Sequence, residues 1–239
     1  MKIAEWASID HIMASKDLRA ASALGLVNAL DILNYSCPIV GFNPTQVTYQ
    51  RDLLMPTNHW SRAVEYPWCL TRAQLQRHHC SADVGGGNNP FQFAVAFCTP
   101  EGQVHNIDTA EDKLILADQL PVRDLFRNVL LVNQDAMTVF VKFDRIFCIS
   151  VLEHTPDPIV FVRHLRDNMT KDGGRLLLTF DVCDLPCADF PISMDGAEVI
   201  LKDMGLAMPD PKDAFMHDGI EVGGIRRPLR VMMVALDKS

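Results

Sequence analysis

Short apolar runs alternate with stretches of helical spacing through the second two-thirds of the chain. The runs rich in apolar or β-branched residues lie at 81–84, 103–107, 128–132, 144–150, 175–180 and 229–236. Helices are predicted between them at about 90–98, 110–119, 157–170 and 194–204. Because strands and helices of this length alternate, the pattern predicts a parallel sheet with helices on both faces.

The first 58 residues do not follow this alternation. Apolar positions predict a helix over residues 16–34, and prolines break the chain between residues 36 and 56. A second helix is expected to begin near Asn58, to be interrupted at Pro67, and to pack its aromatic residues against the sheet. We therefore expect a helical or irregular N-terminal extension over 1–58, a candidate lid, followed by an α/β domain over 59–239.

Composition narrows the class of protein. Hydrophobic residues make up 48% of the 239 residues, which is enough for a substantial core. The net charge of -8 argues against a non-specific nucleic-acid surface or an anionic-membrane surface. The seven cysteines form no C-x-x-C pair, and no stretch is long and apolar enough for a signal peptide or a membrane span. We therefore expect a cytoplasmic protein with free thiols, no nucleic-acid partner and no membrane span.

A glycine-rich turn is the first sign of a ligand site. The predicted strand 81–84 contains Asp83 and is followed directly by Gly85, Gly86 and Gly87. Glycines allow a positive φ and let the backbone approach a ligand closely, although a turn without a ligand has the same pattern. Asp108 ends the next strand 21 positions after Gly87, near the spacing at which an acidic residue binds both hydroxyls of a ribose. The pair predicts a nucleoside derivative, while a helix cap is the alternative role for Asp108.

The residue after the glycines bears on which nucleoside derivative binds. A dinucleotide loop of the form G-x-G-x-x-G/A requires a third small residue, so that the helix packs closely under the pyrophosphate. Pro90 occupies that place here. Proline suits a first helical turn but does not give glycine's close approach, so an NAD(P)-dependent oxidoreductase is the less favoured alternative.

Five segments in order resemble the class I S-adenosylmethionine (SAM)-dependent methyltransferases, close to their "type 11" group. The segments are "DVGGGNNPF", "HNID", "LLVNQDAM", "FDRIFCISVLEHTPDP" and "LRDNMTKDGGRLLLTF", within about residues 80–182. The resemblance implies a Rossmann-like, doubly wound α/β fold with a mostly parallel seven-stranded sheet and an antiparallel last strand. It implies SAM as cofactor, held by Asp83, Gly85, Gly86, Gly87, Asp108, Thr109, Asp135, Ala136, Ile149 and Ser150.

Methyl transfer from a sulfonium is a direct displacement, so the enzyme mainly positions the acceptor and excludes water. A base is needed only if the acceptor loses a proton, and His154, Glu153 and then Asp181 follow the strands that border the expected pocket. His78, His79 and Cys80 cannot converge on one ion from a strand, so no metal is expected.

The expected substrate is a small molecule or a glycan or lipid precursor, with O-, N- and C-methylation all open. The segment Asn88-Asn89-Pro90 departs from the family pattern. This departure supports an alternative function, that of an inactive methyltransferase-like binding or regulatory protein.

Overall fold

The computed structural model describes residues 1–6, 62–118, 123–188, 191–211, 217–222 and 225–239. The predicted helix over residues 16–34 and nearly all of the expected N-terminal extension lie outside these residues. The predictions for the α/β part of the chain fall almost entirely within them.

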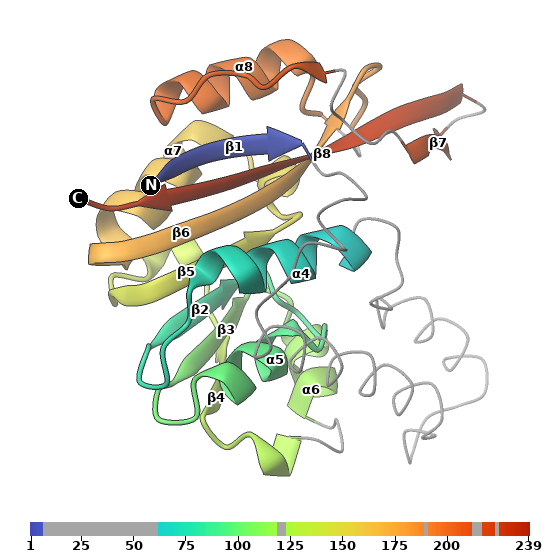
Figure 1. The fold of residues 1–239 in the computed structure, drawn as a ribbon. Helices are drawn as coiled ribbons and strands as arrows, with labels where there is room; N and C mark the ends of the chain where they lie inside the picture. The colour runs from blue at the N-terminus through green and yellow to red at the C-terminus, as the bar shows by residue number, and fades with distance from the viewer. Residues whose placement is uncertain (7–61, 119–122, 189–190, 212–216, 223–224) are drawn as a thin grey trace, which may run out of the picture.

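A single twisted sheet forms the centre of the described structure (Figure 1). Five strands are parallel and lie in the order β6-β5-β2-β3-β4, and β8 pairs antiparallel with β6. Both β1 and β7 pair antiparallel with the other edge of β8. The strands are β1 (Lys2–Trp6), β2 (Ser81–Val84), β3 (Val104–Asp108), β4 (Val129–Asn133), β5 (Phe143–Ile149), β6 (Thr170–Cys183), β7 (His217–Val222) and β8 (Ile225–Asp237).

Helices cover both faces of this sheet, as the alternating pattern predicts (Figure 1). The helices are α4 (Arg62–Ala73), α5 (Phe91–Cys98), α6 (Glu111–Asp118), α7 (Pro158–His164) and α8 (Met194–Asp203). Short 3₁₀ turns lie at η1 (Arg123–Leu125), η2 (Ala136–Thr138) and η3 (Leu152–His154), and a π-turn, η4 (Leu165–Met169), extends α7. Asp157 caps α7 through the N–H groups of Ile159 and Val160, and Pro158 is its first residue.

Strand periodicity divides the buried apolar residues into two cores. On β5, Phe147 and Ile149 belong to the core beneath α4 and α5, whereas Ile146 and Cys148 belong to the core beneath α7 and α8. Successive side chains of a strand point to opposite faces, so a strand buried on both sides contributes to both cores. The predicted doubly wound architecture with an antiparallel last strand is therefore confirmed.

Two details differ from the prediction. The described sheet has eight strands rather than seven, because residues 2–6, expected in a helical or irregular extension, form β1 at the edge of β8. The helix α4 runs through Pro67 instead of being interrupted there. A proline removes one backbone hydrogen bond from a helix, and the burial of Tyr66, Trp68 and Leu70 on α4 offsets this loss.

Within the described part of the chain, none of the helices combines the length and the apolar character that crossing a lipid bilayer requires.

The strand β1 is expected to stabilise the domain mainly through Trp6. This side chain is 2% exposed in the core beneath α7 and α8, and its Nε1 donates to the carbonyl oxygen of Pro209 at 3.2 Å. Trp6→Ala should lower the free energy of unfolding by about 3–5 kcal/mol, measured by urea denaturation. The exposed Lys2 on the same strand is the control, and Lys2→Ala should change it by less than about 0.5 kcal/mol. Equal effects of the two substitutions would contradict this role for β1.

Candidate functional site

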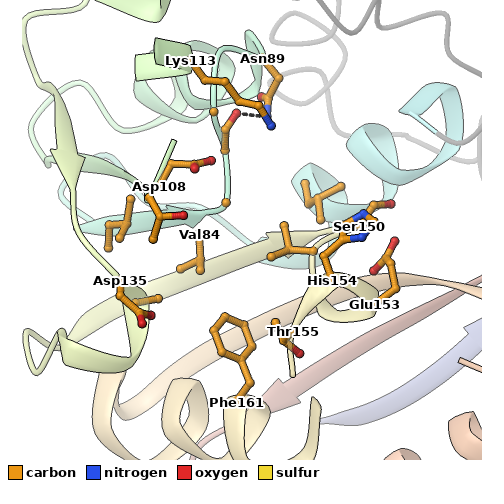
Figure 2. A pocket seen from close by; sticks show the side chains of 18 of the residues that line it. Val84, Asn89, Asp108, Lys113, Asp135, Ser150, Glu153, His154, Thr155 and Phe161 are labelled. Carbon is orange, nitrogen blue, oxygen red and sulfur yellow. Dashed lines mark hydrogen bonds between the residues drawn. The ribbon is translucent and has the colours of Figure 1, made fainter. Parts of the chain in front are cut away.

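A cavity of about 800 Å³ lies beyond the carboxyl ends of the parallel strands. This is the edge of an open α/β sheet at which ligands bind. Every residue predicted for the cofactor or for catalysis lines the cavity except Asp83, which lies beneath its floor. In Figure 2, Asp108 and Asp135 lie at one end, and Ser150, Glu153 and His154 lie together at the other.

The glycine loop is shaped by what lies directly around it. Gly85 and Gly87 have positive φ values of 71° and 51°, which a residue with a side chain rarely adopts. A Cβ on Gly86 would lie 2.5 Å from Asp83 Oδ2 and 2.6 Å from Asn106 Oδ1, so the loop backbone rests on these two side chains. Asn106 also donates from Nδ2 to the carbonyl oxygen of Gly87 at 2.7 Å. The absence of side chains therefore lets the loop lie close to β2 and β3 and leaves its outer side to the cavity.

The carboxyl group of Asp83 is buried beneath this loop. The side chain is 1% exposed, and burial, with a smaller contribution from the charge of Asp108, raises the pKa of Asp83 to about 7. Neither Asp83 Oδ2 nor Asn106 Oδ1 has a hydrogen-bond partner among the described residues. When Asp83 is protonated, its carboxyl O–H supplies the hydrogen-bond donor that these two acceptor oxygens otherwise lack. Asp83 thus supports the loop from below rather than facing a ligand.

Asp108 combines the two roles that the sequence leaves open. Its Oδ1 accepts from the N–H of Ala110 at 2.8 Å, which satisfies the backbone turn before α6. Its Oδ2 lies on the side of Gly87, 3.4 Å from the position that a Cβ on that glycine would take. One oxygen is therefore used by the fold, while the other borders the cavity, where a ribose hydroxyl can reach it.

The unusual Asn-Asn-Pro segment forms an ordered helix start. Asn89 donates from Nδ2 to the carbonyl oxygen of Gly86, and its Oδ1 accepts from the N–H of Phe91 at 2.9 Å. Pro90 follows as the residue before α5. These contacts close the loop over the helix terminus, so the departure from the family pattern preserves a cavity-facing glycine turn.

A polar network links α4 to the opposite end of the cavity. Arg62 donates to Glu65, and also to Ser150 Oγ at 2.6 Å. Glu65 accepts in turn from Ser150 Oγ at 2.8 Å and from Thr179 Oγ1. Burial alone would raise the pKa of Glu65, but the charge of Arg62 and these hydrogen bonds lower it, so Glu65 is an anion paired with Arg62. Ser150 has a positive φ of 49°, and the network holds this strained residue at the cavity wall.

Glu153 and Asp181 form a second buried acidic group at the same end. Glu153 is 2% exposed, and its Oε1 accepts from the N–H of Asp181 at 3.4 Å. Burial and then the neighbouring Asp181 raise the pKa of Glu153 well above its ordinary value. Glu153 is therefore a neutral acid near neutral pH, which disfavours it as the base that the sequence suggests. His154 is exposed and also lines the cavity.

Comparisons with known proteins agree with this geometry. No protein with a curated description matches the sequence significantly. Residues 82–176 match the model of a family described as "Methyltransferase domain". This segment carries the glycine loop, Asp108 and the turn after β5.

Residues 82–176 therefore resemble a methyltransferase domain, which agrees with the predicted family.

Solved structures show how widely this fold is shared. A SAM-dependent methyltransferase from Aquifex aeolicus is 20% identical, with 81% of this chain and 98% of that chain covered and a TM-score of 0.53. The magnesium protoporphyrin IX methyltransferase of Synechocystis PCC 6803, with bound SAM, is 18% identical. The match covers 98% of this chain and 99% of that chain, with a TM-score of 0.50. The [4+2]-cyclase SpnF is 16% identical, and the match covers 75% of this chain and 84% of that chain with a TM-score of 0.55. At these identities the likeness is one of fold.

Several residues in or next to the cavity were not assigned to the site from the sequence; Arg62 and Lys113 line it, and Glu65 and Asn106 lie beside it. Arg62 and Glu65 are three residues apart on one helix, but nothing in the sequence places them against Ser150, 88 positions from Arg62. Asn106 was detectable, because it lies two residues before Asp108 and therefore on the same face of β3. Lys113 reaches the loop from α6, where a Cβ on Gly87 would meet its Cδ at 3.1 Å.

The close approach at Gly86 gives a test of the loop. Gly86→Ala should displace the loop from Asp83 and Asn106, lower the free energy of unfolding by about 1–3 kcal/mol and weaken ligand binding at the cavity. Gly196 on α8 is a matched control, since a Cβ there would meet nothing nearer than 3.4 Å. Gly196→Ala should be neutral or stabilise the helix by up to about 1 kcal/mol in the same urea titration. A Gly86→Ala protein as stable as the control variant would show that the loop is not held against these side chains.

The buried carboxyl of Asp83 predicts a pH-dependent stability. The folded pKa of about 7 lies above the ordinary aspartate value of 3.8, so folding binds a proton. The stabilisation is complete below the unfolded pKa and is lost as pH rises through the folded pKa. Asp83→Asn, which cannot ionise, should therefore gain stability relative to the wild type between about pH 4 and pH 8, by several kcal/mol at the upper end. Urea midpoints measured across this range check the prediction, and parallel curves for the two proteins would refute it.

Proposed function

We propose that this protein transfers a methyl group from SAM to a small-molecule acceptor. The observation that carries the proposal is the second carboxylate oxygen of Asp108, which borders the cavity beside the glycine loop while the first oxygen caps the chain. A ribose hydroxyl is a suitable donor for such an acceptor, and glycine backbone suits the close approach of the rest of a nucleoside.

The donor is proposed to lie along the cavity from β4 towards β5. Its adenine lies beside Asp135 and Ala136, its ribose binds Asp108 and Thr109, and Ile149 borders the opposite end of the cavity. Its amino-acid part crosses Gly85, Gly86 and Gly87 towards Ser150. The sheet order β4-β3-β2-β5 supports this path, because it brings these segments to one edge in that sequence.

The size of the cavity supports a small acceptor. Pockets for small ligands typically occupy about 300–1,000 Å³. The volume of about 800 Å³ lies in the upper part of this range, so donor and a compact acceptor fit together. The acceptor end is lined by the polar and charged groups Arg62, Glu153, His154 and Asp181, which favours a polar small molecule or a polar lipid or glycan precursor.

A binding protein without methyl transfer is the second candidate. It is favoured by one observation, that the fold is shared with SpnF, which is described as a [4+2]-cyclase rather than a methyltransferase. In that case SAM or its demethylated product S-adenosylhomocysteine (SAH) binds, but no acceptor in a metabolite extract takes up methyl label. Turnover of labelled SAM with any acceptor excludes this candidate.

Calorimetry with SAM, SAH and NADH tests the proposed donor, and Asp108 variants test its site. SAM and SAH should bind, and NADH should not. Asp108→Ala should weaken SAH binding by about 1–3 kcal/mol and also lower stability, since both oxygens are removed. Asp108→Asn retains one carbonyl oxygen to cap Ala110, so it should keep the stability and lose most of the same affinity.

Binding of NADH without SAM or SAH would replace the methyltransferase by an oxidoreductase. Unchanged SAH affinity in both variants would instead show that Asp108 is a helix cap alone.

A further inference from the structure

The buried Glu153 and the half-buried Asp181 present two acceptor atoms to which none of the described residues bonds. Glu153 follows β5 on η3, and Asp181 lies on the neighbouring β6. Both line the cavity, and Glu153 lies at the end away from Asp108 (Figure 2). Glu153 Oε2 and Asp181 Oδ1 are buried and have no hydrogen-bond partner among the described residues. Buried acceptors at a cavity wall point to a ligand that supplies a hydrogen or a positive charge.

The surroundings of Glu153 and Asp181 favour a state in which only one of the two carboxyl groups is protonated. Arg62 and Glu65 on α4 are the charged neighbours, and Glu65 is already paired with Arg62, Ser150 and Thr179. Burial, then the charge of Glu65, raises the pKa of Asp181, while Arg62 opposes this shift. Burial and then the charge of Asp181 also raise the pKa of Glu153. Glu153 is the more deeply buried of the two, and its Oε1 already accepts from the N–H of Asp181, so Glu153 keeps its proton and the half-buried Asp181 is the group that ionises.

The order of the strands places this pair on the acceptor side. If the ribose binds at Asp108 on β3 and the amino-acid part of the donor crosses the loop after β2, then the sulfonium lies towards β5. Glu153 follows β5 directly. Asp181 lies on β6, one strand further along this edge of the sheet. This step rests on the proposed function.

We propose that Asp181 is the base of the methyl transfer, that Glu153 positions it, and that the acceptor bears a proton on an attacking oxygen or nitrogen. Asp181 takes that proton as the lone pair of the attacking atom forms a bond to the methyl carbon. The sulfur–methyl bond breaks with its electron pair going to sulfur, so the sulfonium becomes the neutral thioether of SAH. Asp181 then returns the proton to solvent. A base that ionises near the working pH is the most effective for such a step.

Sinefungin provides a probe that needs no knowledge of the acceptor. It carries a protonated amine on carbon where SAM carries its methylsulfonium, whereas SAH carries nothing there. If Asp181 faces this position, its anion should bind the amine, and the wild type should prefer sinefungin over SAH by about tenfold or more at about pH 8. The preference should shrink at about pH 6, where Asp181 is protonated. Calorimetric dissociation constants of the two ligands give the ratio.

Two variants separate the roles. Asp181→Asn should keep the SAH affinity and lose the sinefungin preference at both pH values. Glu153→Ala should keep the SAH affinity and weaken the preference, because it removes the side chain that positions Asp181. Asp184→Asn is the control, since it removes a carboxylate outside the cavity, one paired with Arg230. It should leave both ratios unchanged.

The outcomes distinguish this inference from the proposed function. A sinefungin preference that survives in Asp181→Asn, or one that is unchanged in Glu153→Ala, overturns the role of the pair while SAH binding stands. Failure of SAM, SAH and sinefungin to bind the wild type overturns the proposed function itself.

Discussion

The contact between the glycine loop and the side chains beneath it is the constraint on which the site depends. Asp83 and Asn106 are paired in register on β2 and β3, and both present oxygens to the backbone of Gly86. Burying these two side chains costs free energy, because polar groups beneath a loop stabilise the fold less than apolar groups do. They fix the position of the loop, however, because carboxyl and amide groups define the position of the backbone more narrowly than an apolar contact does. The cavity floor, and with it any bound nucleoside, takes its position from these two residues.

A second fixed point lies at the other end of the cavity. Ser150 leaves β5 with a positive φ, and Arg62, Glu65 and Thr179 hold it there through buried hydrogen bonds. Strained residues of this kind persist only where the surroundings determine them, and they are common at ligand sites. Because Arg62 and Glu65 come from α4, the cavity wall depends on a helix that precedes the whole alternating part of the sheet.

The cavity also has a consistent electrostatic character. Asp108, Asp135, Glu153 and Asp181 line it, against the cations Arg62 and Lys113, and Arg62 is paired with Glu65. The balance is negative, which suits a ligand that carries a sulfonium and an ammonium group. Burial keeps this charge below its formal value, since Glu153 and Asp181 bind protons more tightly than ordinary carboxylic acids. The site therefore combines attraction for a cation with groups whose protons respond to pH near neutrality.

The sequence by itself determined the parts that follow from local pattern. Period-two and period-3.6 spacing located six of the seven described strands and the four described α-helices from residue 81 onward, missing β7, and the spacing of Gly87 and Asp108 predicted two residues that line the cavity. Tertiary structure decided what depends on partners far along the chain. Residues 2–6 became a strand only because β8 offers an open edge, and Pro67 stayed in a helix because its neighbours are buried. Glu153 and Asp181 became a proton-sharing pair only because β5 and β6 are adjacent, since burial and a neighbouring charge, not residue type, set the pKa of a carboxyl group.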